Sequence, residues 1–325
     1  MRQQRDPPPL TVCVAIPTYN REKTLVETLE QVFAQDSPAD EVLVIDQSPD
    51  HEPETTAFLD TADKAGKIRW IRQSPPNLPK ARNRALRETH CDVVVFIDDD
   101  VELPTNFVEN HLRNYGDGQV AAVAGRTVQA NGWSRRECSH PWPRLLDYRL
   151  FRLDSRERVE GIASFVGCNH SVRRRAIVEL GGYDENYIGW AYREDSDAAI
   201  RLWKAGGLVV FDPSAELRHL AMPSGGCRLK TGRKGLPEWY VSFPATYFAF
   251  RHLFPKKWFW QDLLLKNVRR YVLRRHNVFC PWRLPWAAAS YGYAFLRAAW
   301  LASRRRIMDR RAARVLGGPS VGRLS

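Results

Sequence analysis

The chain has 325 residues, of which 44% are hydrophobic, and a formal net charge of +12. This length and hydrophobic content suit one large globular domain, alone or with an appendage. The six cysteines are widely spaced and form no C-x-x-C pair, and residues 1–9 are polar and proline-rich. These features argue against a disulfide scaffold and an export signal, so we expect reduced thiols in a cytoplasmic protein whose first nine residues are a flexible tail.

The positive charge is concentrated towards the C-terminal end. From Arg251 onward there are seventeen Lys or Arg residues against only Asp262 and Asp309, whereas the first 250 residues hold 32 Lys or Arg against 35 Asp or Glu. A nucleic-acid-binding protein would carry its basic groove in the folded domain. We therefore expect no nucleic-acid partner, and different partners for the two portions of the chain.

The first hundred residues alternate short apolar runs with amphipathic segments. We expect strands at residues 11–16, 41–45, 68–71 and 93–97. Helices are expected between them at 53–65 and 79–89, preceded by one that carries Leu25, Leu29, Val32 and Phe33 at helical spacing. Four alternations of strand and helix predict the α/β class, with a mostly parallel, Rossmann-like sheet covered by helices on both faces.

The pattern is less regular after residue 100. We expect helices at 104–115, 176–180 and 194–205, and strands at 120–128, 164–172, 208–211 and 215–220. Residues 132–161 are polar, aromatic and irregular, which predicts a long loop or a partly helical insert.

Three carboxylates, Asp98, Asp99 and Asp100, directly follow the apolar run at 93–97. In an open parallel sheet, ligands gather at the carboxyl ends of the strands. Adjacent carboxylates repel each other, so the cluster is unfavourable unless cations or hydrogen-bond donors balance it. A divalent cation that carries a diphosphate meets this need, and a solvated acidic turn is the alternative interpretation.

Other polar residues are expected at the same edge of the sheet. Asp46 ends the second strand, where it could accept a hydrogen bond from a base imide or simply begin a turn with Ser48. Arg82 and Asn83 lie on the 79–89 helix, from which they could reach a base or phosphates or belong to a solvated face.

Six motifs, in this order, resemble the family 2 glycosyltransferases, which have the GT-A fold. The resemblance covers residues 12–219, about two thirds of the chain. The motifs are Ile16-Pro17-Thr18-Tyr19-Asn20-Arg21, Val44-Ile45-Asp46, Ala81-Arg82-Asn83, Phe96-Ile97-Asp98-Asp99-Asp100, Gly181-Gly182-Tyr183-Asp184-Glu185 and Glu194-Asp195.

The resemblance implies roles for several side chains. It places the nucleoside pocket at Pro17, Tyr19, Asn20 and Asp46, with Arg82, Asn83 and Asp99 near the base and ribose. It makes Asp98 and Asp100 the outer members of a D-x-D motif that binds Mg²⁺ or Mn²⁺ and brings His219 to the metal or diphosphate, although His219 could also be an ordinary strand-end histidine. It puts Gly167, Asn169 and Trp190 on the acceptor side.

The sequence departs from the family pattern at two points. Leu78-Pro79-Lys80 stands where the family usually has a glycine before Ala81-Arg82-Asn83. The Gln-x-x-Arg-Trp motif of processive members is absent after Asp195, which favours transfer of one sugar per encounter over polymerisation.

Asp195 is the expected general base, for a reason that is independent of the resemblance. Transfer of a sugar to a hydroxyl requires a group that accepts the hydroxyl proton as attack proceeds. A carboxylate in the first turn of the 194–205 helix suits that task, with Glu194 as its orienting or acceptor-binding neighbour. The alternative is that both acids only complement the helix dipole.

The C-terminal portion combines cations with tryptophans. Trp258, Trp260, Trp282, Trp286 and Trp300 lie among the seventeen Lys and Arg residues. Basic amphipathic helices that bear Trp lie in the headgroup region of anionic membranes. Residues 284–302 are interrupted by Pro285 and Arg297, so we expect an interfacial helix or a hydrophobic hairpin rather than a membrane span. The alternative is a helical extension packed on the catalytic domain.

We therefore expect a flexible tail at 1–9, a GT-A domain at 10–222 and a basic, membrane-associating helical region at 223–325. The expected activity is metal-dependent, inverting transfer from a nucleotide-sugar to a glycan or lipid-linked acceptor, at the inner face of the cell membrane. A sugar-phosphate nucleotidyltransferase and a non-catalytic basic adaptor are the rival interpretations. The former usually has a glycine-rich loop after the first strand, where this chain has Pro17-Thr18-Tyr19-Asn20.

Overall fold

The computed structural model describes residues 9–130, 132, 154–226, 238–255 and 257–315, with the backbone alone at 238, 257, 258, 262, 264 and 306–315. The chain divides into two compact units. The first comprises Met1–Glu185 and Glu194–Lys230, and the second comprises Asn186–Arg193 and Thr231–Ser325.

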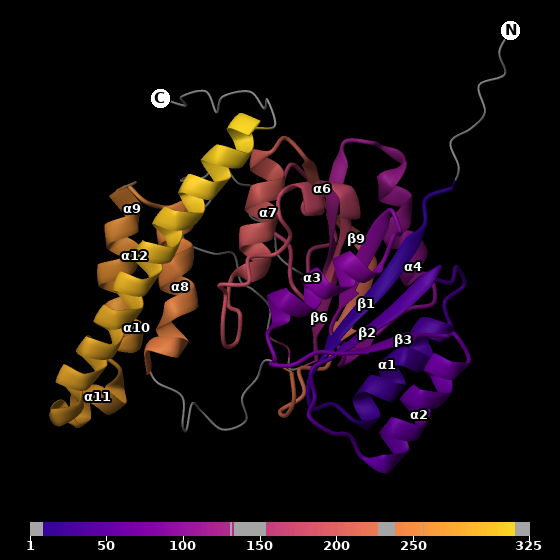
Figure 1. Ribbon diagram of the computed structural model, residues 1–325, viewed down its shortest axis with the longest axis horizontal. Helices are drawn as coiled ribbons and strands as arrows, with labels where there is room; N and C mark the ends of the chain where they lie inside the picture. The colour runs from indigo at the N-terminus through magenta and orange to yellow at the C-terminus, as the bar shows by residue number, and fades with distance from the viewer. Residues whose placement is uncertain (1–8, 131, 133–153, 227–237, 256, 316–325) are drawn as a thin grey trace, which may run out of the picture. The chain divides into compact units, whose positions relative to one another are not determined.

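The first unit is built on one mixed sheet with the strand order β3-β2-β1-β4-β8-β6-β9-β5, to which β7 adds by pairing with β9 (Figure 1). The strands are β1 (Val12–Thr18), β2 (Glu41–Asp46), β3 (Arg69–Arg72), β4 (Val93–Ile97), β5 (Val101–Glu102), β6 (Val120–Gln129), β7 (Val159–Glu160), β8 (Asn169–Arg173) and β9 (Leu208–His219). Strands β1 to β4 pair in parallel, and β8 is antiparallel to both β4 and β6. The α/β class is therefore confirmed, with antiparallel pairing in the second half of the sheet.

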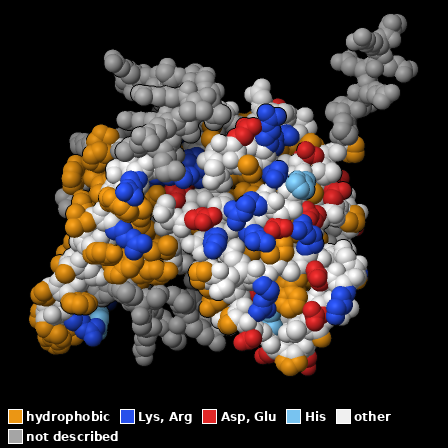
Figure 2. Space-filling view, in the orientation of Figure 1, with side chains coloured by type: hydrophobic (Ala, Val, Ile, Leu, Met, Phe, Trp, Pro, Cys, Tyr) orange, Lys and Arg blue, Asp and Glu red, His pale blue; other side chains and the backbone are white. Residues whose placement is uncertain are grey.

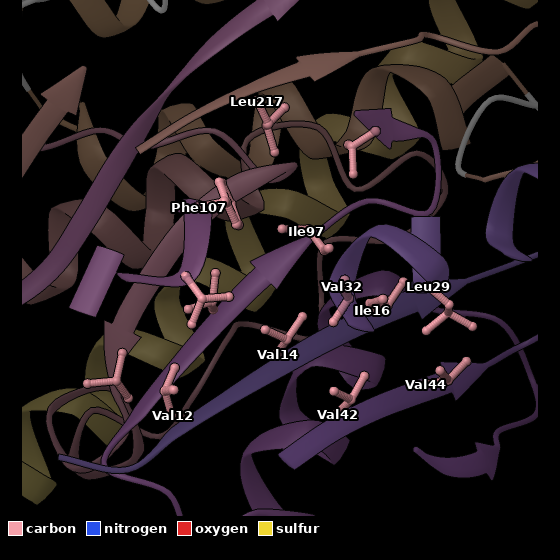
Figure 3. Packing of buried hydrophobic residues seen from close by; sticks show 14 of the residues in the cluster. Val12, Val14, Ile16, Leu29, Val32, Val42, Val44, Ile97, Phe107 and Leu217 are labelled. Atoms are coloured by element: carbon pink, nitrogen blue, oxygen red, sulfur yellow. The ribbon is translucent and has the colours of Figure 1, made fainter. Parts of the chain in front are cut away.

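Helices cover both faces of this sheet (Figure 1). They are α1 (Lys23–Phe33), α2 (Pro53–Lys64), α3 (Leu78–Glu88), α4 (Phe107–Leu112), the 3-10 turn η1 (Arg113–Gly116), α6 (Arg174–Glu179) and α7 (Glu194–Lys204). Alternate residues of a strand point to opposite faces. Val12 and Val14 accordingly pack against α1 and α2 (Figure 3), whereas Cys13 and Ala15 pack on the face that α3 and α7 cover.

Two strands differ from the expected bounds. The strands expected at 208–211 and 215–220 form one strand, β9, which ends at His219, because the break between them is a bulge. The bulge is held by Asp212, whose carboxylate accepts hydrogen bonds from the Ser214 backbone at 2.9 Å and from Asn114 at 2.9 Å. Strand β8 begins only at Asn169, because the preceding residues turn at Gly167 and the Asn169 amide bonds back to Val166.

The second unit is helical. Its elements are α8 (Glu238–His252), α9 (Lys257–Trp260), the π-helical η2 (Gln261–Asn267), α10 (Val268–Tyr271), α11 (Arg275–Phe279), the 3-10 turn η3 (Pro281–Arg283) and α12 (Leu284–Val315). Helices α8 and α12 pack side by side (Figure 1). Residues 284–302 lie within α12, so the expected hairpin is wrong and the single helix holds. Within the ranges that the structure describes, no helix has both the length and the apolar character to cross a bilayer.

Candidate active site

The carboxyl ends of β1, β2 and β4 carry polar side chains to one edge of the sheet. Thr18 of β1 pairs with Asp46 of β2, and its hydroxyl donates to Asp99 beyond the end of β4 at 2.7 Å. On the other side of β4, Ile97 pairs with Asn169 of β8, so Asp98 emerges beside Cys168. The parallel pairing of β1, β2 and β4 and the antiparallel pairing of β8 with β4 therefore place Asp46, the acidic triplet and the start of β8 along a single edge.

Asp98, Asp100 and His219 meet at this edge. Their ligand atoms all lie within 4.8 Å of one another. Nε2 of His219 is 3.2 Å from Oδ1 of Asp100 and 3.6 Å from Oδ2 of Asp98. Adjacent ligands of an octahedral ion with bonds of about 2.1 Å stand about 3 Å apart. The residues therefore fit a divalent cation, and a donor set of two carboxylates and one imidazole suits Mn²⁺ at least as well as Mg²⁺.

Arg21 balances the carboxylates from the opposite side. Its guanidinium donates from Nε to Asp99 and from another nitrogen to Asp100, each at 2.8 Å, and also reaches the carbonyl of Ser224. Oδ2 of Asp100 is thereby occupied by Arg21 and by the Met222 backbone amide at 2.9 Å. Oδ1 is the oxygen that Asp100 presents to His219 and to a cation.

The three carboxylates differ in their affinity for protons. Burial raises the pKa of Asp98 and raises the pKa of Asp99 to about 6, against the opposing charge of Arg21. Burial acts in the same direction on Asp100, but the hydrogen bond and charge of His219, together with Arg21, outweigh it and lower the pKa of that carboxyl. Asp100 is therefore the best anionic ligand of the three. Asp98 keeps 36% of its side chain exposed and can turn towards a bound cation.

Gln129 fixes the orientation of His219. The two residues pair in the register of β6 and β9, and Nδ1 of His219 lies 2.9 Å from Oε1 of Gln129. Because an amide oxygen accepts, Nδ1 carries a ring proton, and Nε2 is the nitrogen that faces Asp98 and Asp100. A hydrogen-bonded partner of this kind is the usual support of a metal-binding histidine.

Asp195 lies in the first turn of α7 and is partly exposed. Oδ2 accepts the backbone amide of Gly167 at 3.1 Å, and Oδ1 accepts that of Ser196 at 2.6 Å. The charges of Asp98, Asp100 and Asp195 all add to burial in raising the pKa of the Cys168 thiol. Gly167, which holds Asp195, lies two residues before Asn169, and Asn169 pairs with Ile97 next to Asp98.

Arg82 has different partners from those expected. Its side chain is buried, pairs with Glu194 and donates to the carbonyl of Gly167 at 3.0 Å. The guanidinium also lies over the rings of Phe96 and Tyr183. Arg82 and Glu194 therefore join α3 to the start of α7 and to the loop that holds Asp195.

Asn83 is likewise turned into the protein. Its amide donates to the Tyr183 carbonyl at 2.8 Å and to Glu185 at 2.9 Å, and its oxygen accepts the Tyr183 backbone amide at 2.7 Å. That oxygen would lie 2.3 Å from a Cβ at Gly182, whose φ is +72°. Only glycine fits there, which accounts for the paired glycines of the 181–185 motif.

Asn169 supports the sheet from inside. It is fully buried, and its amide nitrogen donates to the carbonyls of Arg126 at 2.8 Å and Ala215 at 3.0 Å. These bonds direct its oxygen at His111, 2.9 Å from Nε2. Nδ1 of His111 in turn lies 2.9 Å from the hydroxyl of Ser171. The geometry gives Asn169 a positioning role below the site.

The carboxylate of Asp46 is hydrogen-bonded to three neighbouring side chains. Oδ2 lies at 3.0 Å from His51, 2.9 Å from the Trp70 indole nitrogen and 3.0 Å from Arg72. Arg72 also lies over the Trp70 ring, 5.5 Å from its centroid. Asp46 therefore fixes the side chains of His51, Trp70 and Arg72 at this edge of the sheet.

The remaining predicted residues are placed as follows. Pro17 is buried in β1 and Tyr19 is half-buried, with its carbonyl accepting the amide of Gly226 at 2.7 Å. Asn20 is exposed with φ of 51°, a left-handed conformation that Asn tolerates. Trp190 belongs to the second unit, where its ring packs 6.0 Å from that of Tyr192.

Several residues of the site were not assigned a role from the sequence. Arg21 belongs to the first motif and pairs with Asp99 and Asp100 in the fold. The need of three adjacent carboxylates for a balancing cation was the signal that could have indicated this role. Gln129, His51 and Trp70 gave no such signal, since their partners depend on strand register and on loop closure.

Two family models match the sequence of this chain. The family model described as "Glycosyl transferase family 2" matches residues 13–181, and another described as "N-terminal domain of galactosyltransferase" matches residues 152–224. The N-acetylglucosaminyl-diphospho-decaprenol L-rhamnosyltransferase of Mycobacterium tuberculosis is 33% identical over 174 residues, which cover 51% of this chain and 46% of that protein. The chain thus matches about half the length of that relative.

A second relative and a solved structure extend the comparison. Glucosyl-dolichyl phosphate glucuronosyltransferase of Haloferax volcanii is 25% identical over 222 residues, which cover 65% of this chain and 69% of that protein. The mannosyltransferase PcManGT of Pyrobaculum calidifontis, solved with GDP-Man and Mn²⁺, has a TM-score of 0.52 at 19% identity. The similarity covers 92% of this chain and 80% of the solved one, and it shows a common fold.

Proposed function

Because this chain belongs to glycosyl transferase family 2, with residues 13–181 as the matching segment, we propose that it transfers a sugar from a nucleotide-sugar to an acceptor hydroxyl. The observation that carries the proposal is the cluster of Asp98, Asp100 and His219 at one edge of the sheet. Family membership makes the chain a glycosyltransferase rather than a nucleotidyltransferase or a non-catalytic adaptor.

Asp98, Asp100 and His219 are the proposed ligands of a divalent cation. When bound, the cation would neutralise charge on the diphosphate of the donor and of the leaving nucleotide. Arg21 supports the same region by holding Asp99 and Asp100 in place. Gln129 holds the His219 ring so that Nε2 faces the proposed cation.

Asp195 is the proposed general base. The acceptor oxygen attacks the anomeric carbon, a new glycosidic bond forms, and the bond from that carbon to the diphosphate oxygen breaks. The hydroxyl proton passes to the Asp195 carboxylate, and the nucleoside diphosphate leaves with the bonding electrons. One displacement inverts the anomeric centre. The amides of Gly167 and Ser196 hold the carboxylate for this step.

The nucleoside pocket is proposed at the ends of β1 and β2. Pro17, Tyr19 and Asn20 form its floor, and Asp46 acts by fixing His51, Trp70 and Arg72 at its wall. Asp99 stays bonded to Thr18 and Arg21, between this pocket and the cation site. Arg82 and Asn83 act indirectly, by holding the loops that carry Asp195 and Gly182.

The proposed acceptor is a glycan precursor on a polyprenyl lipid. Both curated relatives carry a polyprenol in their names, decaprenol in one and a dolichyl phosphate in the other. Such an acceptor places the enzyme at the inner face of the cell membrane as a peripheral protein. Glu194 and Gly167 are the proposed neighbours of the acceptor, and the region from residue 223 onward is the proposed membrane-associating domain.

A panel of nucleotide-sugars tests the proposal. We expect hydrolysis or transfer from one sugar derivative of UDP, GDP or dTDP in the presence of Mn²⁺, and loss of turnover with a chelator. With a soluble acceptor analogue, NMR of the product should show inversion at the anomeric carbon. Retention of configuration, or turnover that EDTA leaves unchanged, would refute the mechanism.

A further inference from the structure

Exposed large hydrophobic side chains are distributed very unevenly between the two units. Among the described residues, Val178 is the only one in the first unit, whereas twelve belong to the second. Soluble proteins scatter such residues singly, so a concentration of them marks a binding surface. The twelve are Trp190, Phe254, Trp260, Leu265, Leu273, Val278, Phe279, Trp282, Trp286, Tyr293, Leu296 and Trp300.

Helix α12 carries four large apolar residues on its outer side. Ala287, Ala294, Ala298 and Ala302 are buried where α12 packs on α8. The exposed positions include Trp286, Tyr293, Leu296 and Trp300. At about 100° per residue, these four fall within roughly 80° of one another, in a stripe about 21 Å long. A helix surrounded by water would present charged residues there.

A second group extends the stripe at the start of α12. Val278 and Phe279 at the end of α11, and Trp282 in η3, are 51%, 79% and 73% exposed. Figure 2 shows hydrophobic side chains gathered over α11 and the adjoining part of α12. We call these three residues and the four of the α12 stripe the apolar face.

Cations greatly outnumber acids in the segment that carries the apolar face. Between residues 239 and 305 the sequence contains twelve Lys or Arg residues and a single acid, Asp262. Arg269, Arg270, Arg275 and Arg283 are exposed on α10, α11 and η3. At the other end of the stripe, the guanidinium of Arg304 lies 4.3 Å from the centroid of Trp300.

We propose that the apolar face inserts into the headgroup region of an anionic lipid bilayer, with α12 lying along its surface. Trp and Tyr suit this depth because their rings are apolar and their N–H or O–H groups remain near water. The arginines match the negative surface of the leaflet, which an electroneutral protein partner would not require. The inference deepens the proposed function and rests on it for the location of the acceptor.

Flotation of the full chain with vesicles made only of lipid tests this surface. We expect the wild-type chain to bind vesicles of 30% phosphatidylglycerol in phosphatidylcholine at least tenfold more tightly than pure phosphatidylcholine. The variant Trp286→Ser/Leu296→Ser/Trp300→Ser should lose at least tenfold of that binding while keeping its circular dichroism spectrum. Val178→Ser is the control and should bind like the wild type.

A second set of variants separates charge from apolar contact. Arg269→Gln/Arg270→Gln/Arg275→Gln should lose the preference for anionic vesicles. Replacing the exposed cations Lys23, Arg87 and Arg175 of the first unit by Gln removes the same charge and should not change binding.

Two results would overturn the inference. The first is that the wild-type chain does not bind anionic vesicles, or that the serine variant binds them as tightly as the wild type does. The other is a dimer in sedimentation that the serine variant converts to monomer, because the apolar face would then bind a second copy. Transfer to a soluble acceptor, measured without vesicles, keeps the proposed function separate: if transfer persists without vesicle binding, only this inference fails.

Discussion

Loss of Arg82 should destabilise the first unit far more than loss of an exposed arginine on the same helix. Arg82 is 1% exposed and Glu194 is 3% exposed, so Arg82→Met leaves a buried carboxylate without its cation. Oε2 of Glu194 already lacks a hydrogen-bond partner among the described residues. Removal of one partner from a buried pair costs about 3–5 kcal/mol. This is a large part of the roughly 5–15 kcal/mol that stabilises a typical domain.

The assay is equilibrium unfolding in urea, followed by circular dichroism. Arg84 forms an exposed pair with Glu88 on the same helix, and Arg84→Met should cost less than about 1 kcal/mol. The double variant Arg82→Met/Glu194→Met contains no buried charge, so it should be more stable than the sum of the single losses predicts, by about 2 kcal/mol or more. Additive losses, or an Arg82→Met cost no greater than that of Arg84→Met, would refute the interpretation of this pair.

Three further predictions concern single side chains. Asp195→Asn should keep donor binding and lower turnover at least 100-fold, because it cannot accept the acceptor proton; unchanged turnover would contradict that role. Gln129→Leu should weaken Mn²⁺ binding by about 10–100-fold in an EPR titration, since His219 loses the acceptor that orients it. Burial lowers the pKa of His111 to about 4, below its usual 6.5. The stability that the neutral ring contributes is complete above pH 6.5 and is lost as pH falls towards 4. The unfolding free energy should therefore fall by about 2 kcal/mol from this group between pH 7.5 and 5, and His111→Asn should show a smaller fall.

The sequence allowed the first half of the fold to be predicted well. Strand β4 was expected at its observed bounds because a short continuous run of five apolar residues is typical of a strand that is buried on both faces. The basic C-terminal helices were also expected. The antiparallel strand β8 and the bulge in β9 depend on hydrogen bonds between distant residues, such as Asp212 with Asn114, which local patterns do not encode.

The candidate site was only partly predictable for the same reason. Asp98, Asp100 and His219 were expected together and do lie together, because each stands at or just beyond the end of a strand. Arg82 and Asn83 were expected at the nucleotide, and the structure instead gives them loop-holding contacts. Such partners follow from tertiary packing around Gly167 and Gly182, where the backbone approaches within reach of a buried side chain.

The proposed function requires that a cation held by Asp98, Asp100 and His219 links the protein to a nucleotide. The measurement is calorimetric titration of the wild type and Asp100→Asn with UDP, GDP and dTDP, each with Mn²⁺ and with EDTA. We expect one nucleotide to bind the wild type at least tenfold more tightly with Mn²⁺ than with EDTA, and we expect Asp100→Asn to abolish this difference. Equal affinities with Mn²⁺ and EDTA for the wild type, or a Mn²⁺ effect that survives in Asp100→Asn, would contradict the proposed function.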